Sequence, residues 1–143
     1  MRAVAIDFGR KRIGIAVSDP TGMLARPADT VAGHVNPEIA ARTILDAIAR
    51  LEADDDPIDT IVVGWPKRLD GSANDQTPLA EALAAALERR SGRRVILQDE
   101  RLTSHEAESR LAERERDWRV RKKQLDAAAA AVILQEYLDA NRG

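Results

Sequence analysis

Four acidic residues stand where a charge interrupts apolar sequence. Asp7 ends the first apolar run of the chain, Asp99 and Glu100 follow a β-branched run, and Asp126 directly precedes the longest apolar run, 127–134. Carboxylates gathered in one place cannot all stay ionised without a cation, and Mg²⁺ and Mn²⁺ prefer oxygen ligands. Two such ions about 3.5–4 Å apart would activate a water and stabilise the leaving oxygen of a phosphodiester. If three of these acids converge, their chemistry is that of a metal-dependent nuclease.

Each acid also has a purely structural interpretation. Asp7 could satisfy backbone donors in the glycine-containing turn that follows it, and Glu100 could cap a helix. Asp126 could favour the N-terminus of its helix by about 0.3–1 kcal/mol. The chemical interpretation therefore depends on the combination of acids and on no single one.

Basic residues accompany the acids along the chain. Three of them fill positions 10–12, just after Asp7, one follows Glu100 directly, and six more surround Trp118 in the segment 114–123. Such side chains can hold phosphates through charge-assisted hydrogen bonds, and an indole can stack on a base, although a basic loop can equally be a solvated surface. We expect four of these side chains to bind substrate: Lys11, Arg12, Arg101 and Lys123.

The elements that must position these residues follow from hydrophobic period and turn signals. Strands are expected at 2–7, 13–18, 23–31, 60–64 and 94–98. Helices are expected at 36–51, at 77–91 after a Thr-Pro cap, from 103 onward, and at 125–141. A tight turn makes the first strands antiparallel, whereas helical crossovers make the later strands parallel. The sequence thus predicts one α/β domain over residues 1–143, with a five-stranded mixed sheet flanked by helices and its chemistry at the carboxyl ends of the parallel strands.

Four blocks of sequence together resemble the YqgF family, also called RuvX. They lie at 7–14, at 63–66 with 70–72, at 99–104 and at 122–135, and so run the length of the chain in family order. The resemblance implies an RNase H-like fold, with Asp7, Glu100 and Asp126 as the acids that bind Mg²⁺ or Mn²⁺. It implies a nuclease that matures the 5′ end of precursor small-subunit ribosomal RNA, or a Holliday junction resolvase, with structured RNA, branched DNA and ribosomal precursor particles as partners. Trp65 departs from the family, where leucine is commoner.

Composition removes several other classes of protein. The chain has no cysteine and only two histidines, which excludes thiolate metal sites and makes a histidine cage improbable. With 22 basic and 24 acidic residues, its net charge of −2 argues against an indiscriminate nucleic-acid binder. No apolar run approaches the roughly 20 residues of a membrane span, and no signal peptide is evident, so we expect a cytoplasmic protein that contacts no membrane. Whether it is a monomer or a homodimer is left open.

Three other interpretations compete with the nuclease. Asp7-Phe8-Gly9 also resembles the phosphate loop of actin-like ATPases and sugar kinases, but those proteins need two such domains. The glycines at 9 and 14 have Walker-loop spacing without the lysine that grips phosphate. A nucleic-acid-binding or ribosome-assembly factor, in which the acids only stabilise the fold, stays open.

Overall fold

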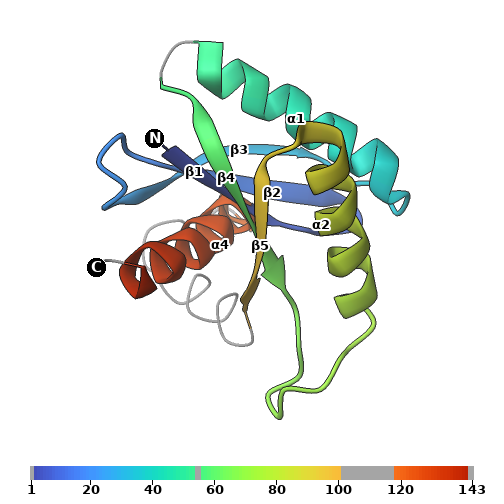
Figure 1. Ribbon diagram of the computed structural model, residues 1–143. Helices are drawn as coiled ribbons and strands as arrows, with labels where there is room; N and C mark the ends of the chain where they lie inside the picture. Colours follow the sequence, from blue (N-terminus) through green and yellow to red (C-terminus); the bar gives the residue numbers. More distant parts are fainter. Residues whose placement is uncertain (1, 54–55, 101–117, 142–143) are drawn as a thin grey trace.

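Runs of apolar and β-branched residues form five strands that pair into one mixed sheet in a computed structural model of the chain (Figure 1). The structure describes residues 2–53, 56–100 and 118–141, with side chains described from Asp126 onward in the last range. The strands are β1 (Arg2–Asp7), β2 (Arg12–Ser18), β3 (Ala25–Ala32), β4 (Ile58–Trp65) and β5 (Arg94–Asp99), and the helices are α1 (Pro37–Ala53), α2 (Thr77–Ser91) and α4 (Trp118–Ala140).

The strand order is β3-β2-β1-β4-β5. β1 pairs antiparallel with β2, and β2 pairs antiparallel with β3, whereas β4 is parallel to both β1 and β5. The predicted combination of an antiparallel meander with two parallel strands is confirmed. The carboxyl ends of β1, β4 and β5 consequently meet at one edge of the sheet.

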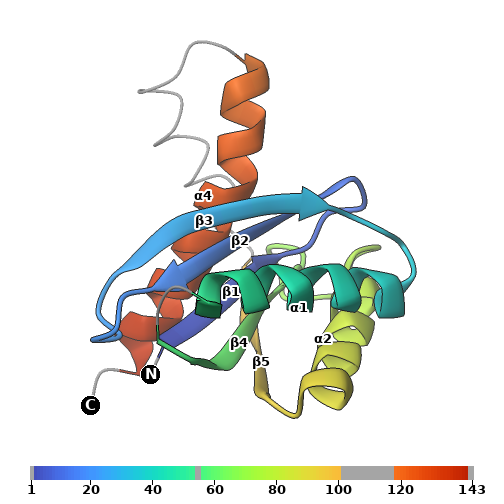
Figure 2. The same ribbon diagram turned by 90° about the horizontal axis from the view of Figure 1, so that it is seen from above.

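Helices cover both faces of the sheet, α1 and α2 on one and α4 on the other (Figures 1 and 2). Because side chains alternate along a strand, Val4 and Ile6 of β1 join the larger core beneath α1 and α2, while Ala3 and Ala5 face α4. Asp7 continues the second series and therefore lies on the α4 side of the sheet.

Small residues let α4 lie close to the sheet. Its buried side chains Ala130, Ile133 and Leu134 pack with Ala5 and Ala16, so an alanine-rich helix meets an alanine-rich strand face. The apolar run at 127–134 is largely buried in this helix, as a segment that is apolar all round should be.

Two local expectations were wrong. The last helix begins at Trp118 and not near 125, so Asp126 lies two turns inside α4 and cannot act on a helix N-terminus. Thr77 does not cap α2, since Gln76 occupies that position and the Thr77 hydroxyl donates to the carbonyl of Pro66. Gly92, with φ 67°, ends α2 as expected.

Some expectations lie outside the described residues. They are the helix opening at Thr103, the contact of Arg101 with substrate, the basic residues before Trp118, and the side chains of the basic residues after it, including the predicted substrate contact of Lys123. No helix in the described ranges is long and apolar enough to cross a membrane.

Candidate functional site

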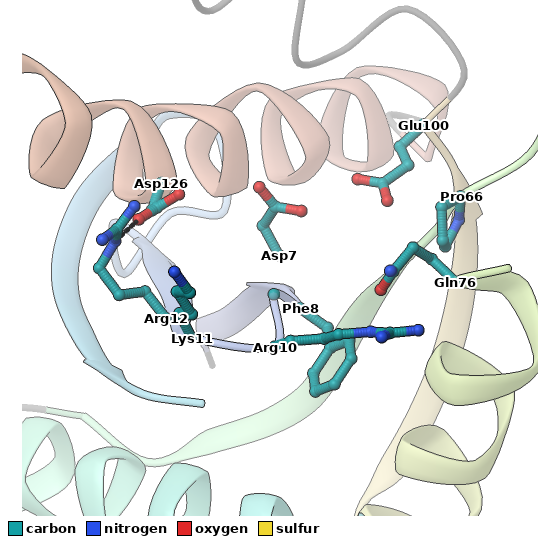
Figure 3. Close-up of a pocket in the computed structure, with 10 residues that line it drawn as sticks. Asp7, Phe8, Arg10, Lys11, Arg12, Pro66, Gln76, Glu100 and Asp126 are labelled. Atoms are coloured by element: carbon teal, nitrogen blue, oxygen red, sulfur yellow. Dashed lines mark hydrogen bonds and ion pairs between the residues drawn. The ribbon is translucent and has the colours of Figure 1, made fainter. Parts of the chain in front are cut away.

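A cleft of about 490 Å³ lies at the sheet edge where β1 ends and β2 begins (Figure 3). It contains all three acids that the family resemblance implies and both basic residues predicted from the loop at 10–12. Its lining consists of Asp7, Phe8, Gly9, Arg10, Lys11, Arg12, Pro66, Gln76, Glu100 and Asp126. Segments far apart in sequence thus meet here as the strand-end argument predicts.

Asp7 and Glu100 form an adjoining pair of carboxyl groups. Burial is the largest effect on Asp7 and raises its pKa to about 7. The interaction with Glu100 lowers this pKa, and the charge of Asp126 raises it further. Burial and then the charge of Asp7 raise the pKa of Glu100 to about 9. With the higher pKa, Glu100 is the member of the pair that keeps its proton at neutral pH. Its Oε2 is buried and has no hydrogen-bond partner.

Glu100 is seated by its own backbone and by a glycine. Its N–H donates to the carbonyl oxygen of Trp65 over 3.3 Å, which fixes the residue against the end of β4. Gly64 faces the Glu100 side chain, and a Cβ at position 64 would lie 2.6 Å from Oε2 of Glu100. Gly64 thereby provides the space that the carboxyl group fills.

Asp126 is paired with Arg12 across the cleft. The Nε of Arg12 donates to Oδ2 of Asp126 over 2.6 Å, and the two side chains are 32% and 25% exposed. In Figure 3, Asp126 and Glu100 lie on either side of Asp7, and Asp126 is turned toward Arg12. Arg12 thus contacts a predicted catalytic acid in this structure, and its contact with a phosphate of the substrate stays a prediction.

The basic loop between β1 and β2 is shaped by backbone packing. The N–H of Gly33 donates to the carbonyl oxygen of Lys11 over 2.8 Å, and a side chain on Gly33 would overlap the backbone of Gly9 and Arg10. This contact holds the loop against the end of β3. Arg10 and Lys11 consequently line the cleft from the side opposite α4.

Two of the three acids in the cleft are available as ligands for a divalent cation, and the third is paired with Arg12. Asp7 and Glu100 offer oxygen ligands, and the unpartnered buried Oε2 is the kind of atom that a cation would satisfy. Within the described ranges, however, no three Asp, Glu or His side chains lie close enough to hold one ion together. The acid that would complete such a set, Asp126, is engaged by Arg12.

Sequence reasoning missed some residues of the cleft. Gln76 reaches the cleft from the start of α2, and Gly14 and Gly64 make room for two of the acids. Gly64 lies inside the strand β4. The available signal was a glycine within a strand pattern, which marks close approach of another segment. Asp70, in the loop after β4, accepts a hydrogen bond from the N–H of Ser72.

Comparison with known proteins places the chain in a family. Residues 1–140 match RuvX, described as Holliday junction resolvase. The chain belongs to the RuvX family. A relative from Geobacillus thermodenitrificans, named as a pre-16S rRNA nuclease, is 39% identical over 147 residues, which cover 99% of this chain and all of the relative. A relative of the same name from Anaeromyxobacter sp. strain K is 44% identical over 139 residues and 97% of both chains.

Solved structures agree with the RNase H-like fold expected for a RuvX chain. RuvC of Thermus thermophilus in complex with a Holliday junction has a TM-score of 0.53 at 19% identity, covering 100% of this chain and 97% of RuvC. The fowlpox virus Holliday junction resolvase has a TM-score of 0.55 at 15% identity, covering 98% and 99% of the two chains. At these identities the likeness supports the fold.

Proposed function

We propose that this RuvX chain is a cytoplasmic, divalent-cation-dependent nuclease that matures the 5′ end of precursor small-subunit ribosomal RNA. The observation that carries the proposal is the adjoining pair of buried carboxyl groups of Asp7 and Glu100, which line a cleft together with basic residues and include a buried oxygen without a hydrogen-bond partner, Oε2 of Glu100. A fold gains little from two buried carboxyl groups side by side, since burial and the charge of Asp7 raise the pKa of Glu100. Their arrangement is consistent with a site for a cation.

The acids and bases of the cleft have separate roles in this proposal. Asp7 and Glu100 would hold Mg²⁺ or Mn²⁺, with Asp126 as the third acid. When bound, such an ion supplies a lowered pKa for water and charge stabilisation at the phosphate. Lys11 and Arg10 lie opposite α4, where they can orient a phosphate by charge-assisted hydrogen bonds. Arg101 and Lys123 remain predicted substrate contacts.

The names of the relatives support precursor ribosomal RNA as the substrate, and we propose ribosomal precursor particles as the partner. A second candidate, a four-way DNA junction, is favoured by the family description and by the fold shared with RuvC. The two candidates differ in symmetry, because a junction resolvase makes two symmetric cuts and needs a two-fold dimer.

The test is cleavage by purified protein of labelled precursor ribosomal RNA and, in parallel, of a synthetic four-way DNA junction. Each substrate is incubated with Mg²⁺, with Mn²⁺ or with chelator. Asp7→Asn should reduce metal-dependent cleavage by at least about 100-fold, while Asp46→Asn, an exposed acid on α1, serves as the matched control. Cleavage of the junction alone would favour the second candidate. Binding of RNA without cleavage, unchanged in chelator and in Asp7→Asn, would contradict the nuclease and indicate a binding factor.

A further inference from the structure

One of the three acids of the cleft is engaged by a basic residue of the protein itself. Asp126 accepts a hydrogen bond from the Arg12 guanidinium over 2.6 Å. The Arg12 contact is a charge-assisted hydrogen bond, which is roughly twice as strong as a neutral one. A cation that needs the third carboxylate must therefore compete with Arg12 for it.

The backbones on both sides of this ion pair are fixed. Arg12 begins β2, two residues before Gly14, and Gly14 packs directly against the backbone of Asp126. Side-chain rotation alone can therefore separate the pair, without movement of α4 or β2. About a third of the Arg12 side chain is exposed to the cleft, where an incoming phosphate can reach it.

We propose that Arg12 is a positioning residue that holds Asp126 away from the cation site until a phosphate of the nucleic acid takes up its guanidinium. The inference rests on the proposed function. The phosphate accepts the hydrogen bonds of Arg12, Asp126 is released, and its carboxylate turns toward Asp7 and Glu100. The set of three acids is then complete only when nucleic acid occupies the cleft.

The family resemblance implies three acids at one cation site, whereas Asp126 is paired with Arg12 in the structure. The proposed exchange of Arg12 from Asp126 to a phosphate accounts for this difference. A guanidinium suits it because its planar fork binds a phosphate as well as it binds a carboxylate. By thermodynamic linkage, bound nucleic acid then raises the affinity of the protein for the divalent cation. Bound cation raises its affinity for nucleic acid by the same factor. A static ion pair that merely stabilises the fold would produce no such coupling.

Two variants separate these possibilities, since Arg12→Gln and Lys11→Gln each remove one positive charge from the same cleft. Arg12 pairs with Asp126, and Lys11 serves as the matched control. Mn²⁺ affinity is measured on metal-free protein by electron paramagnetic resonance, and RNA affinity by fluorescence anisotropy. The RNA is a labelled, nuclease-resistant phosphorothioate strand from the precursor 5′ leader, titrated with and without Mn²⁺. Thermal unfolding confirms that both variants are folded.

We expect Arg12→Gln to bind Mn²⁺ at least about fivefold more tightly than Lys11→Gln does, within the usual range of couplings between sites. Mn²⁺ should raise the RNA affinity of the wild type and of Lys11→Gln about tenfold, and that of Arg12→Gln by much less. If Arg12→Gln binds Mn²⁺ no more tightly than Lys11→Gln, or if all three proteins show the same enhancement, the inference is overturned while the nuclease stands. A wild type that neither binds Mn²⁺ nor cleaves RNA would overturn the proposed function together with the inference.

Discussion

The backbone carbonyl of Asp126 lies where a side chain on Gly14 would have to be. A Cβ at position 14 would overlap the carbonyl oxygen and carbon of Asp126 and lie 2.9 Å from the next backbone nitrogen. Gly14 is also the register partner of Asp7 across β1 and β2. One glycine therefore sets the distance between the first acid and the helix that carries the third.

Gly14→Ala should consequently separate Asp126 from the other acids. Because the overlap is with backbone, the helix must shift, and overpacking of this kind costs about 1–3 kcal/mol of unfolding free energy. We expect cleavage to fall by at least about 100-fold, since a displacement of about 1 Å at a catalytic group has effects of that size. Ile44→Val, a buried change on the opposite face of the sheet, should cost about 0.5–1.5 kcal/mol and leave cleavage intact. Equal loss of activity in both variants would show that stability, and not position, matters.

Gly64→Ala should have a milder effect on the fold than Gly14→Ala. Its Cβ would meet Oε2 of Glu100 at 2.6 Å and Cδ1 of Ile133 at 2.8 Å, and both are ends of side chains that can move. We expect the melting temperature to fall by only a few degrees, about 1 kcal/mol, while Mn²⁺ affinity drops at least about tenfold. Calorimetric titration with Mn²⁺ checks this, and unchanged affinity would mean that the Glu100 carboxyl does not need this space.

Asp7→Asn should stabilise the metal-free protein at alkaline pH. The pKa of Asp7 is raised by folding, so the folded state binds more protons than the unfolded state, and stability falls as pH rises from about 4 to about 7. The amide of asparagine does not titrate, so Asp7→Asn does not lose this stability as pH rises. We expect a gain of about 1–3 kcal/mol at pH 8 in chelator and none at pH 4. Urea unfolding at the two pH values measures the difference, and a variant that is destabilised equally at both would contradict the raised pKa.

Much of this site could be predicted because strand ends are visible in sequence. Asp7 and Glu100 each terminate an apolar run, and parallel strands bring such ends to one edge. The start of α4 was misplaced because residues just before 125 carry charge without an apolar period, which hides a helix. The pairing of Arg12 with Asp126 joins positions 114 residues apart, and no local pattern encodes it. The close approach at Gly14 likewise depends on tertiary packing.

Arg93→Gln should lower stability without affecting the site. Arg93 donates to the carbonyl of Ile58 and to Glu52, each at 2.8 Å, near the amino ends of β4 and β5 and away from the cleft. The hydrogen bond from Arg93 lowers the pKa of Glu52, so this stabilisation is present above the ordinary glutamate pKa and is lost as pH falls through the lowered value. We expect a loss of about 1–2 kcal/mol at pH 7 and a smaller loss in strong acid, with cleavage unchanged. Chemical unfolding against pH checks the sign, and a loss that grows toward acid would contradict it.

The most direct test of the account is a crystal structure of the protein with Mn²⁺ and a nuclease-resistant nucleic acid, examined by anomalous scattering. We expect an anomalous peak in the cleft, within coordination distance, about 2.0–2.2 Å, of carboxylate oxygens of Asp7 and Glu100, with Asp126 turned from Arg12 toward the ion. A cleft without a peak at saturating Mn²⁺, with Asp126 still paired with Arg12, would contradict the proposed cation site.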